Sequence, residues 1–353
     1  MYSFDLSVII PVFNIDIQLF ERCLDSLNSR KVYSVELILV DDGSTNGCEK
    51  ICDNYKSDTI QVIHKNNEGV ASARNIGILA SRGKWITFVD PDDYVSINYF
   101  DSLSKYFNSE EAEVVFFDYN HIFNSTKKMK LPFTKFELGE KEISELKEGA
   151  FYHYKYKGKD YDYETNVVWN KMFRKSFLID NQINFEEKAL KGEDVIFCAH
   201  VYICLNSAVY LSENIYNYVF YAWSVTNKYN ENIVEHNAIS FTIYADYIKK
   251  YNLPQKFTDL LYVRIITRVY SYMRLYFFNK NNKKKYRENK KEILKLINSF
   301  PYDEALSKCK YNFMNFPEKI FVFLLKKKMI CFLKILIKLR EIFRNIKLGR
   351  GRA

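Results

Sequence analysis

The feature that most constrains the fold is an alternation of short apolar runs and helical segments over the first 90 residues. The runs at 6–13 and 35–44 have the continuous apolar pattern of strands buried on both faces, and the runs at 59–65 and 84–90 are predicted as the third and fourth strands. Segments with the apolar spacing of helices separate them, the clearest at 69–83. This order predicts an α/β fold with a mostly parallel central sheet flanked by helices.

Polar side chains follow three of these strands directly. Asn14 comes after the first strand, Asp41 and Asp42 end the second, and the stretch FVDPDDYV (88–95) places several aspartates after the fourth. Open parallel sheets bind ligands at this carboxyl edge. Crowded carboxylates repel one another, so Asp90–Asp93 predicts a divalent cation that bridges to phosphate. The alternative is an ordinary solvated turn, because Asp and Pro are common turn residues.

Several function classes lose support from what the sequence lacks. No G-x-G-x-x-G follows the first strand and no P-loop motif occurs, which disfavours a dinucleotide fold, a P-loop ATPase and a nucleotidyltransferase. The seven cysteines include no C-x-x-C pair, which is typical of reduced thiols in a cytoplasmic protein. The five histidines show no spacing that suggests a metal site.

Five ordered blocks resemble a known family. They are SVIIPVFN (7–14), ILVDDGSTNG (38–47), NNEGVASARNIGILASRGKWITFVDPDD (66–93), VVWNKMFRKSFL (167–178) and GEDVIF (192–197). Together they resemble glycosyltransferase family 2, whose members use nucleotide-sugar donors, have the GT-A fold and invert the anomeric configuration. The resemblance implies a GT-A domain over 1–230 and leaves 231–353 as a helical, basic C-terminal region.

The resemblance also implies roles on the donor side. Pro11 and Asn14 lie beside the nucleoside, and Asp42 accepts a hydrogen bond from the base. Arg74 approaches the nucleotide or its phosphates; the alternative is an ion-pair partner. Asp90 contacts the ribose, and Asp92 holds Mn²⁺ or Mg²⁺ against the diphosphate. Asp93 supports the loop, and Asp90 and Asp93 are further candidate metal ligands.

On the acceptor side, the resemblance makes Asp194 the general base that deprotonates a hydroxyl group. The alternative is that Glu193 and Asp194 only favour the start of a helix. Trp169 either stacks on an acceptor sugar or fills the core. One departure concerns the donor: Val219 stands where relatives often have a basic residue that helps to hold the diphosphate, and Lys228 is a candidate substitute.

These assignments predict transfer of a hexose or N-acetylhexosamine from a UDP-sugar to a saccharide acceptor. The expected acceptor is a lipid-linked or surface saccharide, as in capsule or exopolysaccharide biosynthesis. One alternative is a catalytically degenerate, membrane-docked scaffold, and a less favoured one is a nucleotidyltransferase.

The C-terminal third carries much of the net charge of +9. An amphipathic helix is predicted at about 316–348, with Lys327, Lys334, Lys338, Glu341 and Asn345 on one face and Phe332, Ile335, Leu336, Leu339, Ile342, Phe343 and Ile346 on the other. Lysines beside an apolar face predict peripheral association with the inner face of the cell membrane. The alternatives are packing on the protein's own core or against a second subunit in a homo-oligomer. Nucleic acid is not an expected partner, because the basic residues alternate with aliphatic ones.

Overall fold

The structure, a computed structural model, describes residues 2–28, 33–123, 125–131, 133, 136–152, 163–220 and 229–347. Within these ranges, the side chains of 125, 163, 164 and 343–347 are not described. The chain forms two compact units, Met1–Ala150 with Tyr161–Ala222 and Phe151–Asp160 with Trp223–Ala353. Each unit is described by itself below.

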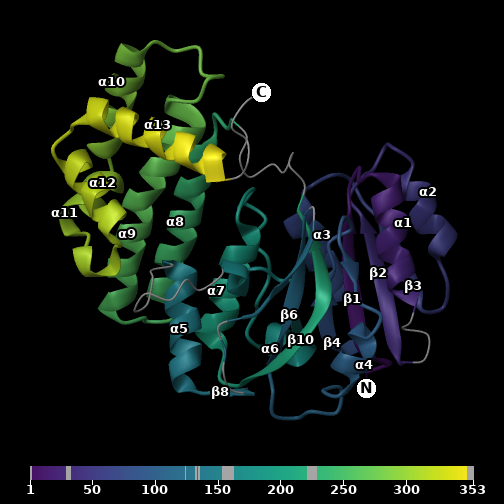
Figure 1. Cartoon of the computed structure of the whole chain (residues 1–353). Coiled ribbons are helices and arrows are strands. Elements are labelled where there is room, and N and C mark those ends of the chain that lie inside the picture. The colour runs from purple at the N-terminus through teal and green to yellow at the C-terminus, as the bar shows by residue number, and fades with distance from the viewer. Residues whose placement is uncertain are drawn as a thin grey trace. The chain divides into compact units, whose positions relative to one another are not determined.

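The first half of the sheet in the first unit is parallel, as the apolar runs predict. Strands β1 (Phe4–Val12), β2 (Val35–Asp41), β3 (Ile60–His64) and β4 (Gly83–Phe88) lie in the order β3-β2-β1-β4. Six of the seven residues from Leu6 to Val12 are apolar and buried, which is why this segment is a continuous apolar run. The carboxyl ends of these strands meet at one edge (Figure 1).

The other half of the sheet is mixed. Strand β9 (Lys171–Arg174) lies antiparallel between β4 and β6 (Val114–Phe123), and β10 (Ala208–Val219) is parallel to β6. Three short strands pair antiparallel at the margins: β5 (Tyr94–Val95), β7 (Ser125–Met129) and β8 (Glu137–Leu138). The expectation of a mostly parallel central sheet flanked by helices is confirmed, with β9 inserted antiparallel inside the sheet and β5, β7 and β8 antiparallel at its margins.

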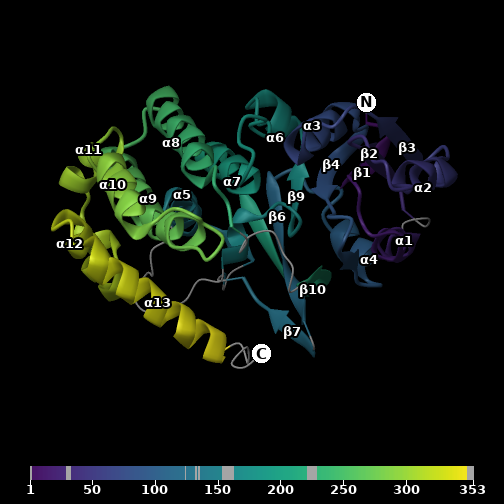
Figure 2. The same ribbon diagram turned by 90° about the horizontal axis from the view of Figure 1, so that it is seen from above.

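Helices cover both faces of this sheet (Figure 2). The segments are α1 (Ile17–Ser26), α2 (Cys48–Tyr55), α3 (Val70–Ala80), α4 (Tyr99–Ser104), α5 (Glu140–Phe151), the 3₁₀ turn η2 (Tyr163–Asn166), α6 (Lys175–Asp180) and α7 (Glu193–Cys204). Helix α3 lies very close to β1, because a Cβ atom on Gly77 would meet the Ile9 side chain. The small residues of the predicted helix 69–83 therefore bring Arg74 close to the sheet.

The second unit is helical in its described part. Its segments are α8 (Ile233–Lys250), α9 (Gln255–Tyr272), the π-helical turn η4 (Met273–Phe277), α10 (Tyr286–Ile297), α11 (Tyr302–Lys308), the 3₁₀ turn η5 (Tyr311–Phe313), α12 (Phe316–Lys326) and α13 (Ile330–Lys347). The amphipathic segment predicted as one helix at about 316–348 is thus two helices. The chain turns between them, where Lys328 adopts a positive φ of 55°. Among the described helices, none is both long and apolar enough to cross a membrane.

Candidate functional site

The loops that follow β1 and β2 are tied together by Asn14. Its backbone N–H donates to Ser44 Oγ at 3.1 Å, and its side-chain oxygen accepts from the Thr45 N–H at 2.8 Å. Pro11 is buried within β1, opposite Val40 of β2. Both predicted nucleoside contacts therefore shape the carboxyl edge of the sheet, and their contact with a ligand stays a prediction.

The Asp42 carboxylate is occupied by the protein itself. It accepts from Lys65 Nζ at 2.6 Å and from the backbone N–H groups of Glu68 and Gly69 at 3.0 and 2.8 Å. Only 3% of Asp42 is exposed. Because Gly69 immediately precedes α3, these bonds fix the start of the helix that carries Arg74. A base N–H would have to share an acceptor with three existing donors, so the geometry favours a positioning role for Asp42.

Asp93 holds the aspartate loop from inside the protein. Its carboxylate accepts from the Tyr216 hydroxyl at 2.8 Å and from the Val219 N–H at 2.7 Å. The same hydroxyl accepts from the Asp90 N–H at 3.2 Å. Burial, reinforced by the charges of Asp92 and Asp90, raises the pKa of Asp93 well above its usual value. With both oxygens engaged, Asp93 is poorly placed as a metal ligand and well placed to support the loop.

Asp92 presents a different environment. Arg22 Nη2 donates to its backbone carbonyl at 2.7 Å, which fixes the main chain. Its carboxylate has no hydrogen bond or ion pair with any side chain that the structure describes. Burial and the neighbouring Asp90 charge raise the pKa of Asp92 to about 6. The nearby Arg22 charge opposes this rise but is bonded to the backbone carbonyl, so the carboxylate oxygens are left to bind a cation from solution.

Arg74 brings three carboxylates from two distant segments together. Its Nη2 donates to Asp90 at 2.9 Å, and its Nη1 donates to Asp194 at 2.6 Å and to Glu193 at 3.5 Å. These partners are 16, 120 and 119 residues away in sequence. The guanidinium lies over the Phe185 ring, 5.3 Å from its centroid, and the residue is 3% exposed. The predicted ribose contact and the predicted general base therefore share one buried cation.

Asp194 sits in the first turn of α7, after Gly192 at a φ of 78°. Its side chain remains 20% exposed, so a hydroxyl group can reach it. Burial raises the pKa of Asp194 to about 7, Arg74 opposes this rise, and Glu193 and Asp90 add to it. A carboxylate with such a pKa is matched to accepting a proton near neutral pH.

Comparisons with known proteins identify the family of this domain. The sequence profile described as Glycosyl transferase family 2 matches residues 7–181. The chain carries a glycosyl transferase family 2 domain. Glycosyltransferase GlyG of Streptococcus pneumoniae is 28% identical over 218 residues, 60% of this chain and 70% of GlyG. Glycosyltransferase GlyA of the same organism is 26% identical over 230 residues, 64% of this chain and 32% of GlyA, so the match spans about a third of that protein.

One solved structure is similar in fold over almost the whole chain. The crystal structure of Staphylococcus aureus TarS 1–349 in complex with UDP-GlcNAc has a TM-score of 0.65 at 18% sequence identity. The similarity covers 99% of this chain and 93% of that one. At this identity the likeness establishes the GT-A fold, including a helical part after the sheet domain.

The residues at the family 2 site fit a divalent metal ion through Asp92. Hard cations prefer carboxylate oxygens, and Mg²⁺ commonly uses one or two carboxylates together with substrate phosphates. The described residues contain no cluster of three or more potential metal-ligating side chains. Asp92, with Asp90 beside it, would therefore hold the ion as part of a site shared with the diphosphate.

The predictions for Trp169 on the acceptor side and for Val219 beside the diphosphate meet different outcomes. Trp169 is 3% exposed and stacks on Tyr216 and Tyr218, with ring centroids 4.7 and 5.3 Å away, so the packing favours the core alternative. At Val219 the backbone, not the side chain, contributes, through its bond to Asp93. Lys228, the predicted substitute for a basic residue, lies outside the described residues.

The sequence analysis missed the residues that hold the site in place. Lys65, Tyr216 and Arg22 anchor Asp42, Asp93 and Asp92 respectively. Lys65 had a detectable signal, because it follows the third strand at the same edge. Tyr216 and Arg22 had none, since their positions depend on how β10 and α1 pack.

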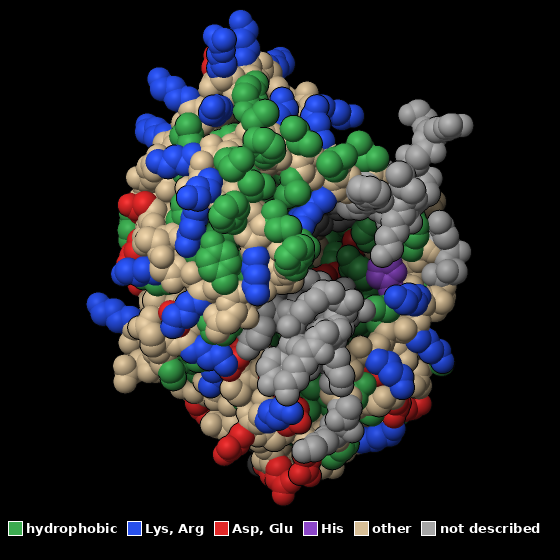
Figure 3. All heavy atoms as spheres, turned by 60° about the vertical axis from the view of Figure 1, so that its left-hand side comes forward, with side chains coloured by type: hydrophobic (Ala, Val, Ile, Leu, Met, Phe, Trp, Pro, Cys, Tyr) green, Lys and Arg blue, Asp and Glu red, His purple; other side chains and the backbone are tan. Residues whose placement is uncertain are grey.

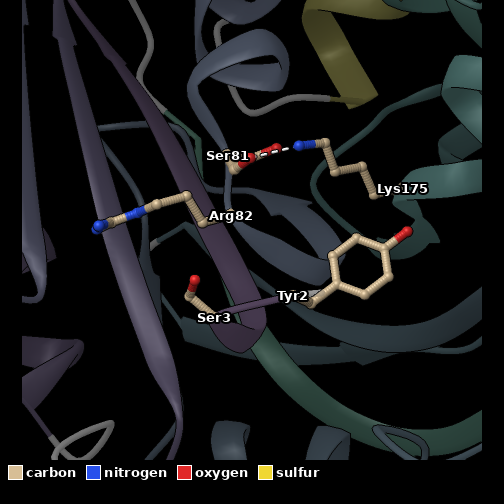
Figure 4. Close-up of a pocket in the computed structure, with 5 residues that line it drawn as sticks. All are labelled: Tyr2, Ser3, Ser81, Arg82 and Lys175. Carbon is tan, nitrogen blue, oxygen red and sulfur yellow. Dashed lines mark hydrogen bonds between the residues drawn. The ribbon is translucent and has the colours of Figure 1, made fainter.

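A pocket at the opposite edge of the sheet carries none of this chemistry. Figure 4 shows its lining: Tyr2, Ser3, Ser81, Arg82 and Lys175, around a volume of about 310 Å³. Its cations already have partners, because Lys175 Nζ donates to the Ser81 carbonyl and Arg82 Nε donates to buried Glu36 at 2.8 Å. The candidate site is therefore the carboxyl edge.

Proposed function

We propose that the chain is an inverting glycosyltransferase that moves a hexose or N-acetylhexosamine from a UDP-sugar to a saccharide acceptor. The observation that carries this proposal is the position of Arg74 between Asp90 and Asp194. It joins the aspartate loop, which would face the donor, to Asp194, the proposed general base for an acceptor. The family 2 domain supports glycosyl transfer, and the complexes of TarS with UDP and UDP-GlcNAc support a UDP-sugar donor.

In the proposed reaction an acceptor hydroxyl oxygen attacks the anomeric carbon while the bond from that carbon to the UDP oxygen breaks. Asp194 takes the hydroxyl proton, and the bonding electrons leave with UDP. Asp92 would hold a Mn²⁺ or Mg²⁺ ion, which would supply positive charge to offset the charge that develops on the diphosphate. One displacement without a covalent intermediate inverts the anomeric configuration. The acceptor in this proposal is a growing surface polysaccharide or a lipid-linked oligosaccharide.

The test is release of UDP from a panel of UDP-sugars, with Mn²⁺ or with EDTA. Wild type is compared with Asp92→Ala and Asp194→Asn, and with Asp58→Ala as an exposed acidic control away from the site. We expect metal-dependent release by wild type and the control, and its loss in Asp92→Ala. Asp194→Asn should bind UDP like wild type but lose roughly 10²- to 10⁴-fold in transfer to an acceptor, the range for a missing general base.

Three results would contradict the proposal. Pyrophosphate release in place of UDP would indicate a nucleotidyltransferase. Metal-dependent UDP binding without turnover of any donor would favour a degenerate, membrane-docked scaffold. The absence of both UDP release and UDP binding would exclude a nucleotide-sugar function.

A further inference from the structure

Helices α12 and α13 carry apolar side chains that remain exposed in the described part of the structure. Six of them are 49% to 74% exposed: Phe316, Phe323, Phe332, Ile335, Leu339 and Ile342. On α13 the exposed residues are spaced at i, i+3, i+7 and i+10, which places them on one helical face. Figure 3 shows apolar side chains gathered on this side of the molecule, with Lys and Arg side chains beside them. We call this surface the C-terminal apolar face.

The opposite sides of the same helices pack within the second unit. Leu325 of α12 and Leu333 and Ile337 of α13 are fully or almost fully buried. Each helix therefore has a buried apolar side for folding and a separate exposed apolar side. Core packing accounts for the buried side but not for the exposed side. Exposed apolar patches of this kind mark interaction sites.

The charge around this face indicates the partner. Between 316 and 342 the sequence has seven basic residues and two acidic ones, Glu318 and Glu341. Glu318 is committed to the capping box of α12, where it accepts from the Asn315 N–H at 2.9 Å. Four lysines in this stretch stand exposed: Lys319, Lys327, Lys328 and Lys338. An isologous dimer through this face would set the same positive charges against one another, which disfavours a second copy of the chain.

We infer that the C-terminal apolar face docks on the surface of an anionic lipid bilayer. The exposed Phe, Ile and Leu side chains enter the boundary between headgroups and acyl chains, and the lysines contact acidic headgroups. Two helices lying in the interface give a broader contact than one. This inference is independent of the proposed transferase reaction, because docking requires neither a donor nor the aspartate loop.

The test is co-sedimentation of the full chain with vesicles, without any nucleotide. Vesicles of phosphatidylcholine alone are compared with vesicles that also contain phosphatidylglycerol, at low and high salt. We expect partitioning into the anionic vesicles only, weakened by salt because exposed charges are screened. Lys327→Gln with Lys338→Gln should weaken partitioning roughly 30-fold, since each basic residue near anionic lipid contributes about a fivefold factor.

A second variant separates the apolar contribution from charge. Phe332→Ser with Leu339→Ser should weaken partitioning on the order of 30-fold, because each half-exposed side chain loses its burial in lipid. The matched control is Leu79→Ser with Ile97→Ser, which removes two exposed apolar side chains from the first unit and should leave partitioning unchanged. Circular dichroism melting of each variant checks that these surface substitutions leave the fold intact.

Three outcomes would overturn the inference. One is absence of wild-type binding to anionic vesicles, and another is equal binding by the Phe332 and Leu339 variant. The third is a concentration-dependent oligomer, seen by light scattering, that dissociates only in the Phe332 and Leu339 variant. A second copy of the chain would then cover the face.

Discussion

Replacement of Arg74 by Met should destabilise the first unit strongly and in a pH-dependent way. The substitution keeps an apolar stem over Phe185 and removes the cation shared by Asp90, Asp194 and Glu193. Removing one partner of a buried ion pair costs about 3–5 kcal/mol. The Asp90 and Asp194 side chains keep 24% and 20% exposure, so water can partly resolvate them. We therefore expect the lower end of that range, about 3 kcal/mol at about pH 8.

The sign of the pH dependence follows from the carboxylates left behind. In wild type Arg74 opposes the rise in the pKa of Asp194 that burial causes. Without Arg74 the folded-state pKa moves further above the unfolded value, so the folded variant binds protons more readily than the unfolded chain. Stability that is present at low pH is then lost as pH rises through the folded pKa. The difference from wild type should shrink between about pH 8 and about pH 5.

The assay is urea unfolding followed by tryptophan fluorescence, because Trp85 and Trp169 are both buried in this unit. Arg174→Met is the matched control. Arg174 also lies over a ring, 5.0 Å from the centroid of Trp85, but its close bonds are to the carbonyls of Ser109 and Ala112. Its loss should cost stability without the pH dependence. A loss below about 1 kcal/mol for Arg74→Met, or equal losses at both pH values, would refute the ion-pair argument.

Three further predictions concern the site and the sheet. Transfer activity should fall as pH drops below about 7, because burial raises the pKa of Asp194 to about 7 and the protonated acid cannot act as a base; a rate profile flat to about pH 5 would contradict this. Gly83→Ala should destabilise the protein by several kcal/mol in thermal melting, because its Cβ would lie 2.6 Å from a backbone nitrogen of β1. The control Gly139→Ala should be near neutral, because its Cβ meets only a flexible side chain at 3.3 Å. Tyr216→Phe should cost about 1.5–3 kcal/mol and weaken metal-dependent UDP binding, because it removes a charge-assisted bond to Asp93; unchanged calorimetric UDP affinity would argue against the loop's role.

The part of the fold that the sequence predicts best is the part buried on both faces. Strands β1 and β2 are continuous apolar runs because apolar layers cover both sides of a parallel sheet, whereas the edge strand β3 buries only Ile60. Strand β9 was not predicted, since four residues are too few to show the alternating pattern of a strand. Its antiparallel place between β4 and β6 is set by tertiary pairing.

At the site, the sequence predicts which loops carry chemistry but not which side chains are already occupied. The positions after β1, β2 and β4 follow from strand ends alone. Protein donors saturate Asp42 and Asp93 but not the Asp92 carboxylate. These donors are Lys65, Tyr216 and backbone N–H groups. These partners lie 23 to 126 residues away in sequence, beyond any local pattern.

The C-terminal helices show the same limit for surfaces. Apolar periodicity in α13 predicts an amphipathic helix, but its apolar residues fall on two sides. Leu333 and Ile337 are buried, whereas Ile335 and Leu339 are exposed, and all four are aliphatic residues of similar size. Hydropathy cannot distinguish them, because only the packing of α13 in the second unit decides which side is covered. The lysines are the better indicator of the open side, since a charged side chain keeps its head in water and borders the apolar surface that the fold leaves uncovered.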